Sequence, residues 1–417
     1  DTYPGIPGGH SGGCRGSQGV SYGGAGSRGQ AYISEFYPSD SGIGDPSKFV
    51  LLSFEDTSNL TDFSPGDICT NQNGTASGFI AEVTETNLLI YTDSGTWSIG
   101  DVVVTMTGMG GGILGVARTI FPTGFYWIKN REAADQHQLI DTMNGPSNVC
   151  HSPDATLGNI YTPPEGESIA WSWRAGKTIE DNSDGTIESR VSANIKAGFS
   201  IVQWEGDGTT GTVGHGLWST PEFIIETGYS SGIPVYHSAA SDTLSQPSYA
   251  LLNQNAAFVN TDVWNESAMS DTVFGVDGTN NVTNPDGNTM TAYVWHSVPG
   301  YSAFGSYTGN AGANGPFVYL GFKPAFVMVK RIDNTYPWYI WDSSRNAHNP
   351  TNLKLYPNTN GKENSVSGET LNTNNIDILS NGFKLVTNTG NTNSAASYIY
   401  AAFAENPFFG RVPPTAR

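Results

Sequence analysis

The sequence has few charged residues, few cations and few cysteines, and it contains no long apolar run. Only 14% of its 417 residues are charged, and 19 Lys and Arg stand against 38 Asp and Glu, for a formal net charge of −19. Surfaces that bind nucleic acid need clustered Lys and Arg, so this balance excludes nucleic acid as an expected partner. No apolar run approaches the roughly 18 to 20 residues of a membrane-spanning helix, so we expect no membrane insertion.

Cysteine is scarce, and its count is odd. Cys14, Cys69 and Cys150 have the spacing of no metal motif, so at most one disulfide, or only free thiols, is expected. The seven histidines are dispersed, and none pairs with another at metal-ligand spacing. We therefore predict no metal site and no cofactor. The chain begins with Asp1, as expected of a processed chain or of a portion of a longer protein.

Glycine, proline and aromatic residues are abundant instead. The chain holds 51 Gly and 23 Pro, and 12% of its residues are aromatic. This composition favours short strands joined by tight turns over helices, and the aromatic content argues against disorder. At about 150 residues per domain, the length indicates roughly three domains. The sequence therefore predicts an all-β protein of several units.

Two different regions precede the repeats. Residues 1–46 are rich in glycine and have few branched apolar residues, so they are costly to order. We interpret them as a Gly-rich arm that becomes ordered only by packing on something else. Residues 47–112 contain short alternating segments separated by Gly-Asp turns, which predict a small β-barrel that serves as a spacer.

The remainder of the chain repeats three strand-like segments in the same order, and the leading Phe of the first segment returns about every 100 residues. The repeats predict three β-sandwich units at 113–190 (partial), 191–299 and 300–417. The three segments of each unit are 125–131 (FYWIKNR), 137–141 (HQLID) and 168–173 (SIAWSW); 223–227 (FIIET), 235–238 (VYHS) and 290–295 (MTAYVW); and 326–331 (FVMVKR), 338–343 (WYIWDS) and 398–403 (YIYAAF).

The later two units share two further segments. A leading strand at 199–206 matches 302–309, and a late strand at 273–276 matches 382–386, whereas the first unit has no segment like the leading strand. His137 and His237 fall at similar places in the second segment of two units, which predicts a packing or hydrogen-bonding role for them. Helix is nearly absent, apart from one short turn expected between Arg131 and Gln138.

The last unit contains five distinctive segments, and one segment of the first unit accompanies them. They are Ser302 to Asn310 (SAFGSYTGN), Gly321 to Val327 (GFKPAFV), Asp342 to Arg345 (DSSR), Leu379 to Leu385 (LSNGFKL) and Tyr398 to Phe408 (YIYAAFAENPF), and earlier Phe125 to Arg131 (FYWIKNR). Through these segments the chain resembles a repeat family of tail-fibre-like and other virion structural proteins of marine and cyanobacterial phages. The resemblance covers about Gly115 to Phe409 and is strongest from Gly300 onward.

The resemblance implies a viral protein on the exterior of a phage virion. We expect a tail fibre or receptor-binding protein that adheres to glycans or proteins of the host cell surface and contacts other virion proteins. Fibres and decorations are commonly symmetric oligomers, so a homotrimer is expected, with the Gly-rich arm at the contact between subunits or with the capsid. A capsid decoration or cement protein is the alternative, and a glycan depolymerase is the second alternative.

No catalytic constellation stands out, and we predict that the protein is not an enzyme. A glycan hydrolase needs two carboxylates at a fixed separation. The candidates Glu205, Asp207, Glu226, Asp333 and Asp342 form no such spaced pair in the sequence.

Most aromatic residues fall in the repeated segments and are expected in the core. Tyr229 and Tyr336 instead fall in the turn between the first two segments of different units. They are the candidate ligand-binding residues.

Overall fold

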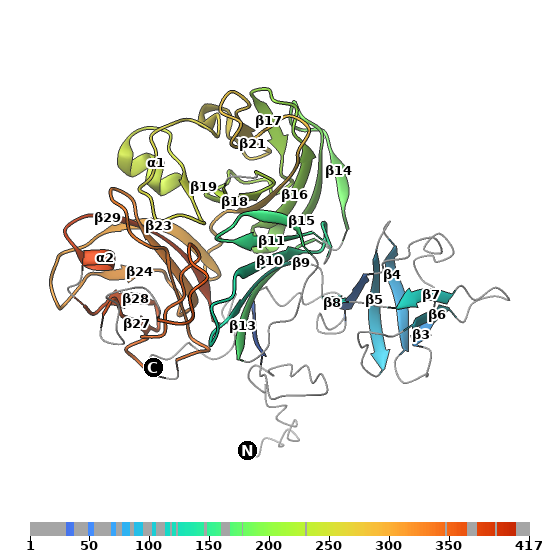
Figure 1. Cartoon of the computed structure of the whole chain (residues 1–417), viewed down its shortest axis with the longest axis horizontal. Coiled ribbons are helices and arrows are strands. Elements are labelled where there is room, and N and C mark those ends of the chain that lie inside the picture. Colours follow the sequence, from blue (N-terminus) through green and yellow to red (C-terminus); the bar gives the residue numbers. More distant parts are fainter. Residues whose placement is uncertain are drawn as a thin grey trace, which may run out of the picture.

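In the computed structural model the chain is almost entirely β-structure (Figure 1). The structure describes residues 124–405, apart from 146–147, 160–166, 177, 230–231, 347, 365–372 and 388–389, together with the backbone of eight earlier strands. The prediction of an all-β fold is confirmed. Helix within the described residues is limited to α1 (Ser238–Leu244), α2 (Gly390–Asn393) and the 3₁₀ helices η3 (Ile195–Ala197) and η4 (Glu266–Ala268).

The strands expected between residues 47 and 112 are present, but they form an open sheet. Seven strands pair in the order β7-β6-β3-β4-β5-β2-β8. A barrel needs hydrogen bonds between its first and last strands, and no described pairing joins β7 to β8, so the predicted small β-barrel is wrong. The strands are β2 (Phe49–Ser53), β3 (Ile68–Asn71), β4 (Ser77–Val83), β5 (Asn87–Ser94), β6 (Val102–Thr105), β7 (Ile113–Val116) and β8 (Thr119–Phe121).

Each predicted repeat contains one main sheet. The strand orders are β1-β13-β9-β10-β11-β12, β14-β15-β16-β22-β18-β19-β20 and β23-β29-β25-β26 for the first, second and third units. The predicted division between residues 190 and 191 lies inside β15 of the second sheet. The bounds are β9 (Gly124–Asn130), β10 (His137–Asp141), β11 (Val149–Ser152), β12 (Thr156–Asn159) and β13 (Ser168–Arg174); β14 (Glu180–Asn182), β15 (Ser189–Asn194), β16 (Phe199–Glu205), β18 (Phe223–Thr227), β19 (Pro234–His237), β20 (Ala250–Leu251) and β22 (Thr289–Trp295); and β23 (Ser302–Thr308), β25 (Pro324–Arg331), β26 (Tyr339–Asp342) and β29 (Ser397–Ala404).

The hydrogen-bond register confirms that the repeated strands are equivalent. In each main sheet the first repeated strand lies between the third and the second. Its leading Phe is paired on one side with the last aromatic residue of the third repeated strand, and on the other side with a residue at the end of the second repeated strand. The leading strands of the later units also keep the predicted alignment, since β16 and β23 pair with these same aromatic residues. The three triplets are Trp173, Phe125 and Asp141; Trp295, Phe223 and His237; and Phe403, Phe326 and Asp342.

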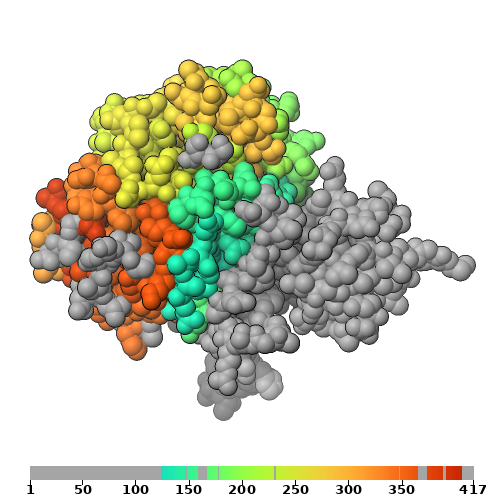
Figure 2. All heavy atoms as spheres, in the orientation of Figure 1, coloured from blue at the N-terminus to red at the C-terminus, as the bar shows by residue number. Residues whose placement is uncertain are grey.

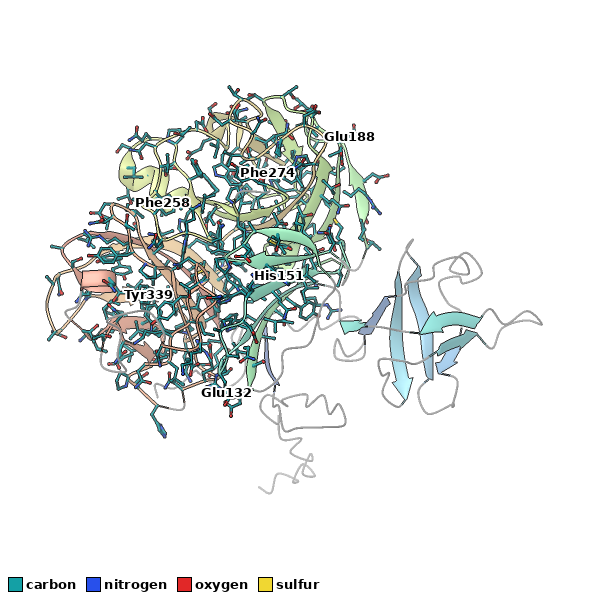
Figure 3. All side chains as sticks on the ribbon, in the orientation of Figure 1. Glu132, His151, Glu188, Phe258, Phe274 and Tyr339 are labelled. Carbon is teal, nitrogen blue, oxygen red and sulfur yellow. The ribbon has the colours of Figure 1, made fainter. Side chains whose placement is uncertain are left out.

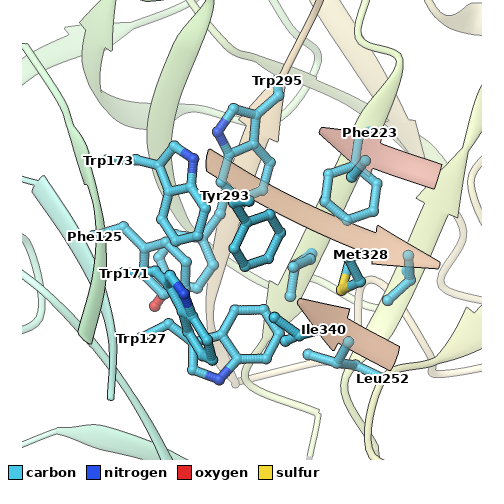
Figure 4. Packing of buried hydrophobic residues seen from close by; sticks show 14 of the residues in the cluster. Phe125, Trp127, Trp171, Trp173, Phe223, Leu252, Tyr293, Trp295, Met328 and Ile340 are labelled. Atoms are coloured by element: carbon cyan, nitrogen blue, oxygen red, sulfur yellow. The ribbon is translucent and has the colours of Figure 1, made fainter. Parts of the chain in front are cut away.

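The three main sheets turn corresponding faces toward one another and bury one core between them, which we call the shared core. The three units surround it as separate sectors of the chain (Figures 1 and 2). Phe125, Phe223 and Phe326 all belong to it, so the units bury their matching strands alike, but in a common interior. Rings of different units meet there, at centroid distances of 3.8 Å for Phe125 and Tyr293 (both labelled in Figure 4), 5.2 Å for Trp173 and Phe403, and 5.4 Å for Phe223 and Phe304.

The outward faces of the second and third main sheets are covered by smaller outer sheets. Phe274 and Phe383, which the sequence aligned, are both fully buried between the two layers. The later two units are therefore β-sandwiches, and because their strands are buried on both faces they read as nearly continuous apolar runs. The outer strands are β17 (Gly211–Gly214) and β21 (Val273–Val276) in the second unit, and β24 (Phe317–Tyr319), β27 (Ile376–Leu379) and β28 (Gly382–Leu385) in the third.

The first unit obtains its missing leading strand from the arm. β1 (Ala31–Phe36) pairs with β13 at the edge that corresponds to β16 beside β22 and to β23 beside β29. The pairing is parallel, whereas both later leading strands are antiparallel. This part of the arm is thus ordered by pairing with a sheet, as predicted for a segment that cannot build a core of its own.

His137 and His237 are not equivalent, so that part of the sequence interpretation is wrong. His237 lies opposite Phe223, as Asp141 lies opposite Phe125. His137 lies four residues before Asp141, at the other end of its strand. The strands are equivalent, but their histidines occupy different positions along them.

Both histidines nevertheless make hydrogen bonds to the third unit from fully buried positions. Trp127 Nε1 donates to His137 Nδ1 at 2.9 Å, so His137 Nε2 carries the proton that it donates to the Tyr356 carbonyl at 3.1 Å. His237 Nε2 lies 3.0 Å from the Tyr400 carbonyl. Burial lowers the pKa of both rings, that of His237 to about 4, so both rings act as neutral links between units.

The helical turn expected between Arg131 and Gln138 is absent. Residues 131–133 form a bend in which Asn130 Oδ1 accepts the backbone N–H groups of Glu132 at 2.8 Å and Ala133 at 2.9 Å. These two hydrogen bonds close an Asn-type turn directly after β9, and the chain continues to β10 without a helical turn.

Candidate binding surface on the third unit

An exposed pair of aromatic residues lies on the outer sheet of the third unit. Phe317 and Tyr319 are 44% and 68% exposed, whereas Val318 between them is buried. Because side chains alternate along a strand, both rings stand on the solvent side of β24, roughly 7 Å apart. We call Phe317 and Tyr319 the aromatic platform.

The neighbouring strands supply polar groups beside the platform. By register, Tyr319 lies opposite Gly382, and Phe317 lies opposite Lys384, which in turn lies opposite Asp377. A Cβ atom on Gly382 would lie 3.0 Å from the Phe317 ring, so the glycine leaves room for the ring to lean across β28. Burial raises the pKa of Asp377, and Lys384 opposes this shift. Apolar rings beside an ammonium and a carboxyl group suit a ligand that presents both C–H faces and hydroxyls.

The second unit shows that the fold does not require aromatic residues at these positions. When the buried Val and Phe pair of each outer sheet is aligned, Phe317 and Tyr319 correspond to Thr212 and Gly214. There the surface is covered by the chain itself, because a Cβ atom on Gly214 would lie 1.6 Å from the Asn182 side chain. The third unit leaves the same surface open and places two aromatic rings on it.

The candidate residues Tyr229 and Tyr336 lie in equivalent links, between β18 and β19 and between β25 and β26. Each is partly buried. Tyr229 packs against the apolar layer between the two sheets of the second unit. Tyr336 is covered by the guanidinium of Arg331, 5.0 Å from the ring centroid, and Arg331 also pairs with Asp333 at 2.5 Å. The structure does not bring the two tyrosines together, and their role as contact residues stays a prediction.

A groove of about 550 Å³ lies along the second main sheet. Its lining includes Gln203 and Glu205 of β16. Because side chains alternate along a strand, they lie on the same face of β16 as Phe199, which belongs to the shared core. The groove therefore lies where this face of β16 extends beyond the shared core. Glu205, one of the candidate carboxylates, accepts a hydrogen bond from Thr289 at 3.2 Å. The groove also brings it near Glu188 (labelled in Figure 3), which the sequence did not single out.

Three of the other four candidate carboxylates hold local structure. Asp342 is buried, accepts the backbone N–H groups of Ser344 and Arg345 and pairs with the Arg345 side chain. Asp333 pairs with Arg331, and Asp207 accepts two hydrogen bonds from the residue two positions later. These contacts account for the three carboxylates without a reaction.

Glu226 is different, because it is fully buried and neither of its oxygens has a hydrogen-bond partner. Burial raises the pKa of Glu226 well above its ordinary value. By register it occupies the position of Ile128 and Val329, in the apolar layer under the outer sheet. It therefore lies inside a sandwich, where it is closed to a substrate.

The repeated lysine of the first and third units also has a structural role. Lys129 and Lys330 are buried, and each donates from Nζ to the carbonyl of the next residue, at 2.6 and 2.9 Å. Burial lowers their pKa values to about 8 and about 7. Thr227 takes this position in the second unit, so the buried lysine is not common to all three units.

Within the described residues, no group of three or more His, Cys, Asp or Glu side chains is placed to hold a metal ion. Cys150 is a buried free thiol, and burial raises its pKa to about 12. Cys14 and Cys69 lie outside the residues whose side chains are described. In the same described part of the chain, no helix is long and apolar enough to cross a bilayer.

The fold and the exposed surface together define a tandem-repeat β-sandwich protein whose last unit presents an aromatic platform. A family model described as a domain of unknown function, DUF7483, matches residues 159–407. This match spans more than half of the 417 residues, and the chain belongs to this family. Comparison with curated proteins and with solved structures finds no significant match.

Proposed function

We propose that this protein is an exterior phage virion protein, a tail fibre or receptor-binding protein, that binds host-surface glycans through the aromatic platform. The single observation that carries the proposal is the contrast between the two outer sheets. The outer sheet of the third unit is open and carries the aromatic residues Phe317 and Tyr319. The equivalent positions of the second unit carry the small residues Thr212 and Gly214, and Asn182 covers Gly214.

Exposed aromatic rings have a physical cost that a binding role explains. Apolar surface left in water loses the stabilisation of burial, about 25 cal/mol per Å². The second unit shows that the fold forms without exposed aromatic rings at these positions. Stacking on the C–H face of a sugar recovers part of this burial, and Lys384 and Asp377 stand beside the rings to bond hydroxyls. The virion setting comes from the sequence resemblance, and a homotrimer would multiply weak single contacts into firm adhesion.

The test is binding of the purified protein to immobilised lipopolysaccharide and to a panel of defined hexasaccharides. We expect the Phe317→Thr/Tyr319→Thr double variant, which copies the polar character of the second unit, to bind about 5- to 150-fold more weakly, since each of the two aromatic contacts contributes about 0.5–1.5 kcal/mol. Leu157→Thr, which removes another exposed apolar side chain in the first unit, is the matched control and should bind like the natural chain. Equal binding by the double variant and the natural chain would refute the platform.

Two other functions remain open as alternatives. A capsid decoration or cement protein would be located on the capsid by electron microscopy of labelled particles, and its affinity would depend on the arm. A glycan depolymerase would use the groove that contains Glu205 and Glu188, and purified protein would release reducing ends from a polysaccharide that it binds.

A further inference from the structure

Trp218 is the exposed exception among the tryptophans of this chain. Nine of the ten tryptophans have described side chains, and eight of them are buried, whereas Trp218 is 63% exposed. It lies in the second unit, in the loop that connects β17 of the outer sheet to β18 of the main sheet. Indole is the largest apolar side chain, so its exposure is a departure from the pattern of the whole molecule.

The backbone of Trp218 is also unfavourable. Its φ is +58°, in the left-handed region where a bulky side chain is a genuine outlier and where glycine is the usual residue. The chain does use glycine for this purpose two residues earlier, at Gly216, with φ +68°. Neither burial nor backbone preference explains a tryptophan here, and strain of this kind concentrates at functional positions.

The third unit builds the same connection without this residue. Gly321, with φ +81°, corresponds to Gly216, and the buried Phe322 corresponds to the buried Leu217. A single residue then leads to the proline before the core strand in the third unit, whereas the second unit has Trp218, Ser219 and Thr220 in that place. The second unit has therefore gained two residues that the fold does not need.

The loop is held rigidly on the Gly216 side of the indole. The backbone N–H of Leu217 donates to His215 Nδ1 at 3.2 Å, and His215 Nε2 lies 3.4 Å from the Ser270 carbonyl. Burial lowers the pKa of His215 to about 4, so the ring stays neutral and Nδ1 remains an acceptor. A loop backbone that is already held in place loses little conformational freedom when a ligand binds the exposed indole.

From these observations we infer that Trp218 is a second sugar-stacking residue, which gives one chain two separate glycan contacts, one on the second unit and one on the third. The inference rests on the proposed glycan binding. A protein partner would need about 1,000 Å² or more of contact, and Ile195 and Val259 are the two other exposed large apolar side chains in the described part of the second unit. One indole, followed in the chain by the hydroxyl residues Ser219 and Thr220, matches a single pyranose ring instead.

The experiment titrates the natural chain, Trp218→Ala and the platform double variant with lipopolysaccharide and with cellohexaose, chitohexaose and mannohexaose, and records tryptophan fluorescence and affinity. We expect a fluorescence change in the natural chain and in the platform variant that is lost in Trp218→Ala. The affinity of Trp218→Ala for lipopolysaccharide should fall by about two- to tenfold, as expected for the loss of one aromatic contact. Unchanged affinity and fluorescence in Trp218→Ala, with binding by the natural chain intact, would overturn the inference and leave the platform standing.

A stability measurement separates a binding role from a structural one. Trp218→Gly removes the left-handed strain, so this variant should unfold at a higher temperature than Trp218→Ala and no lower than the natural chain, while it loses the fluorescence change. A lower unfolding temperature for Trp218→Gly than for the natural chain would show that the indole supports the fold, and it would overturn the inference. A changed oligomeric state in light scattering, with glycan affinity unchanged, would assign Trp218 to a subunit contact and would also overturn it.

Discussion

The cost of burying the unpaired Glu226 carboxyl group can be measured with one substitution, which is taken from a neighbouring repeat. The carboxyl lies in the apolar layer of the second sandwich, 0% exposed, with no hydrogen-bond partner on either oxygen. The first unit places Ile128 at the equivalent position. Glu226→Ile therefore replaces an unpaired polar group with a side chain that the same strand accepts elsewhere in the molecule.

The expected gain has two parts. Burial of an unpaired polar group costs about 1–3 kcal/mol, and Glu226→Ile recovers this amount even where the carboxyl is neutral. The second part depends on pH, because burial raises the pKa of Glu226 in the folded state well above that in the unfolded state. Between these two pKa values the folded chain holds a proton that the unfolded chain has released, so the stability of the natural chain falls as pH rises, by about 1.4 kcal/mol per pH unit.

Urea unfolding at pH 5 and pH 7, followed by tryptophan fluorescence, measures both parts. Glu226→Ile should be more stable than the natural chain by about 1–3 kcal/mol at pH 5, and by up to about 2.7 kcal/mol more at pH 7. Glu226→Gln keeps the unpaired polar group but cannot ionise, so it should match the natural chain at pH 5 and exceed it at pH 7. Glu188→Gln, at an exposed position in the same unit, is the control and should show neither effect.

One result would refute this reasoning. If the difference in unfolding free energy between the natural chain and Glu226→Gln is the same at pH 5 and pH 7, the carboxyl has a normal pKa in the folded protein. Water or a polar partner would then reach Glu226, and the second sandwich would be less tightly closed than its buried Phe274 indicates.

Three further outcomes follow from single residues. Burial lowers the pKa of His237 to about 4, so the stability it contributes is complete above the ordinary histidine pKa and is lost as pH falls toward 4; the unfolding free energy of His237→Gln should decline less between pH 7 and pH 5. Cys150 is 2% exposed, and burial raises its pKa to about 12. Iodoacetamide at pH 8 should therefore leave it unmodified, as measured by mass spectrometry, until the chain is unfolded. Rapid alkylation of the native protein would contradict its burial. Gly321→Ala should lower the unfolding free energy by about 1 kcal/mol, because the backbone of Gly321 is left-handed. Gly312→Ala is the control, because the backbone of Gly312 is not in that region, and it should change the unfolding free energy less. Equal effects of the two substitutions would contradict the conformational explanation.

The strands and their equivalence were predictable from the sequence, because both depend on local patterns. Alternating apolar residues define a strand by period, and recurrence of the same aromatic residue at the same offset defines a repeat. Phe125, Phe223 and Phe326 therefore occupy matching positions in the register. The histidine equivalence failed because both histidines lie in short second strands, where an error of a few residues in the alignment changes the assigned position.

The candidate surface was not predictable in the same way. Phe304 and Phe317 both lie in strands of the last unit, yet Phe304 is 9% exposed within the shared core and Phe317 is 44% exposed. Their difference depends on which layer covers each strand, and that layer comes from another part of the chain. The same holds for Tyr229 and Tyr336, since a turn position made them look accessible while packing and a neighbouring guanidinium cover them in part.

The sequence by itself therefore determined the β-structure, the number of repeats and the positions of the matching strands, because local periodicity and recurrence carry that information. Only the tertiary structure decided that three sheets share one core, that β1 completes the first sheet, and which aromatic rings remain in water. The physical reason is that burial is a property of contacts between segments far apart in the chain, whereas alternation along one strand specifies two faces without specifying what lies against either of them.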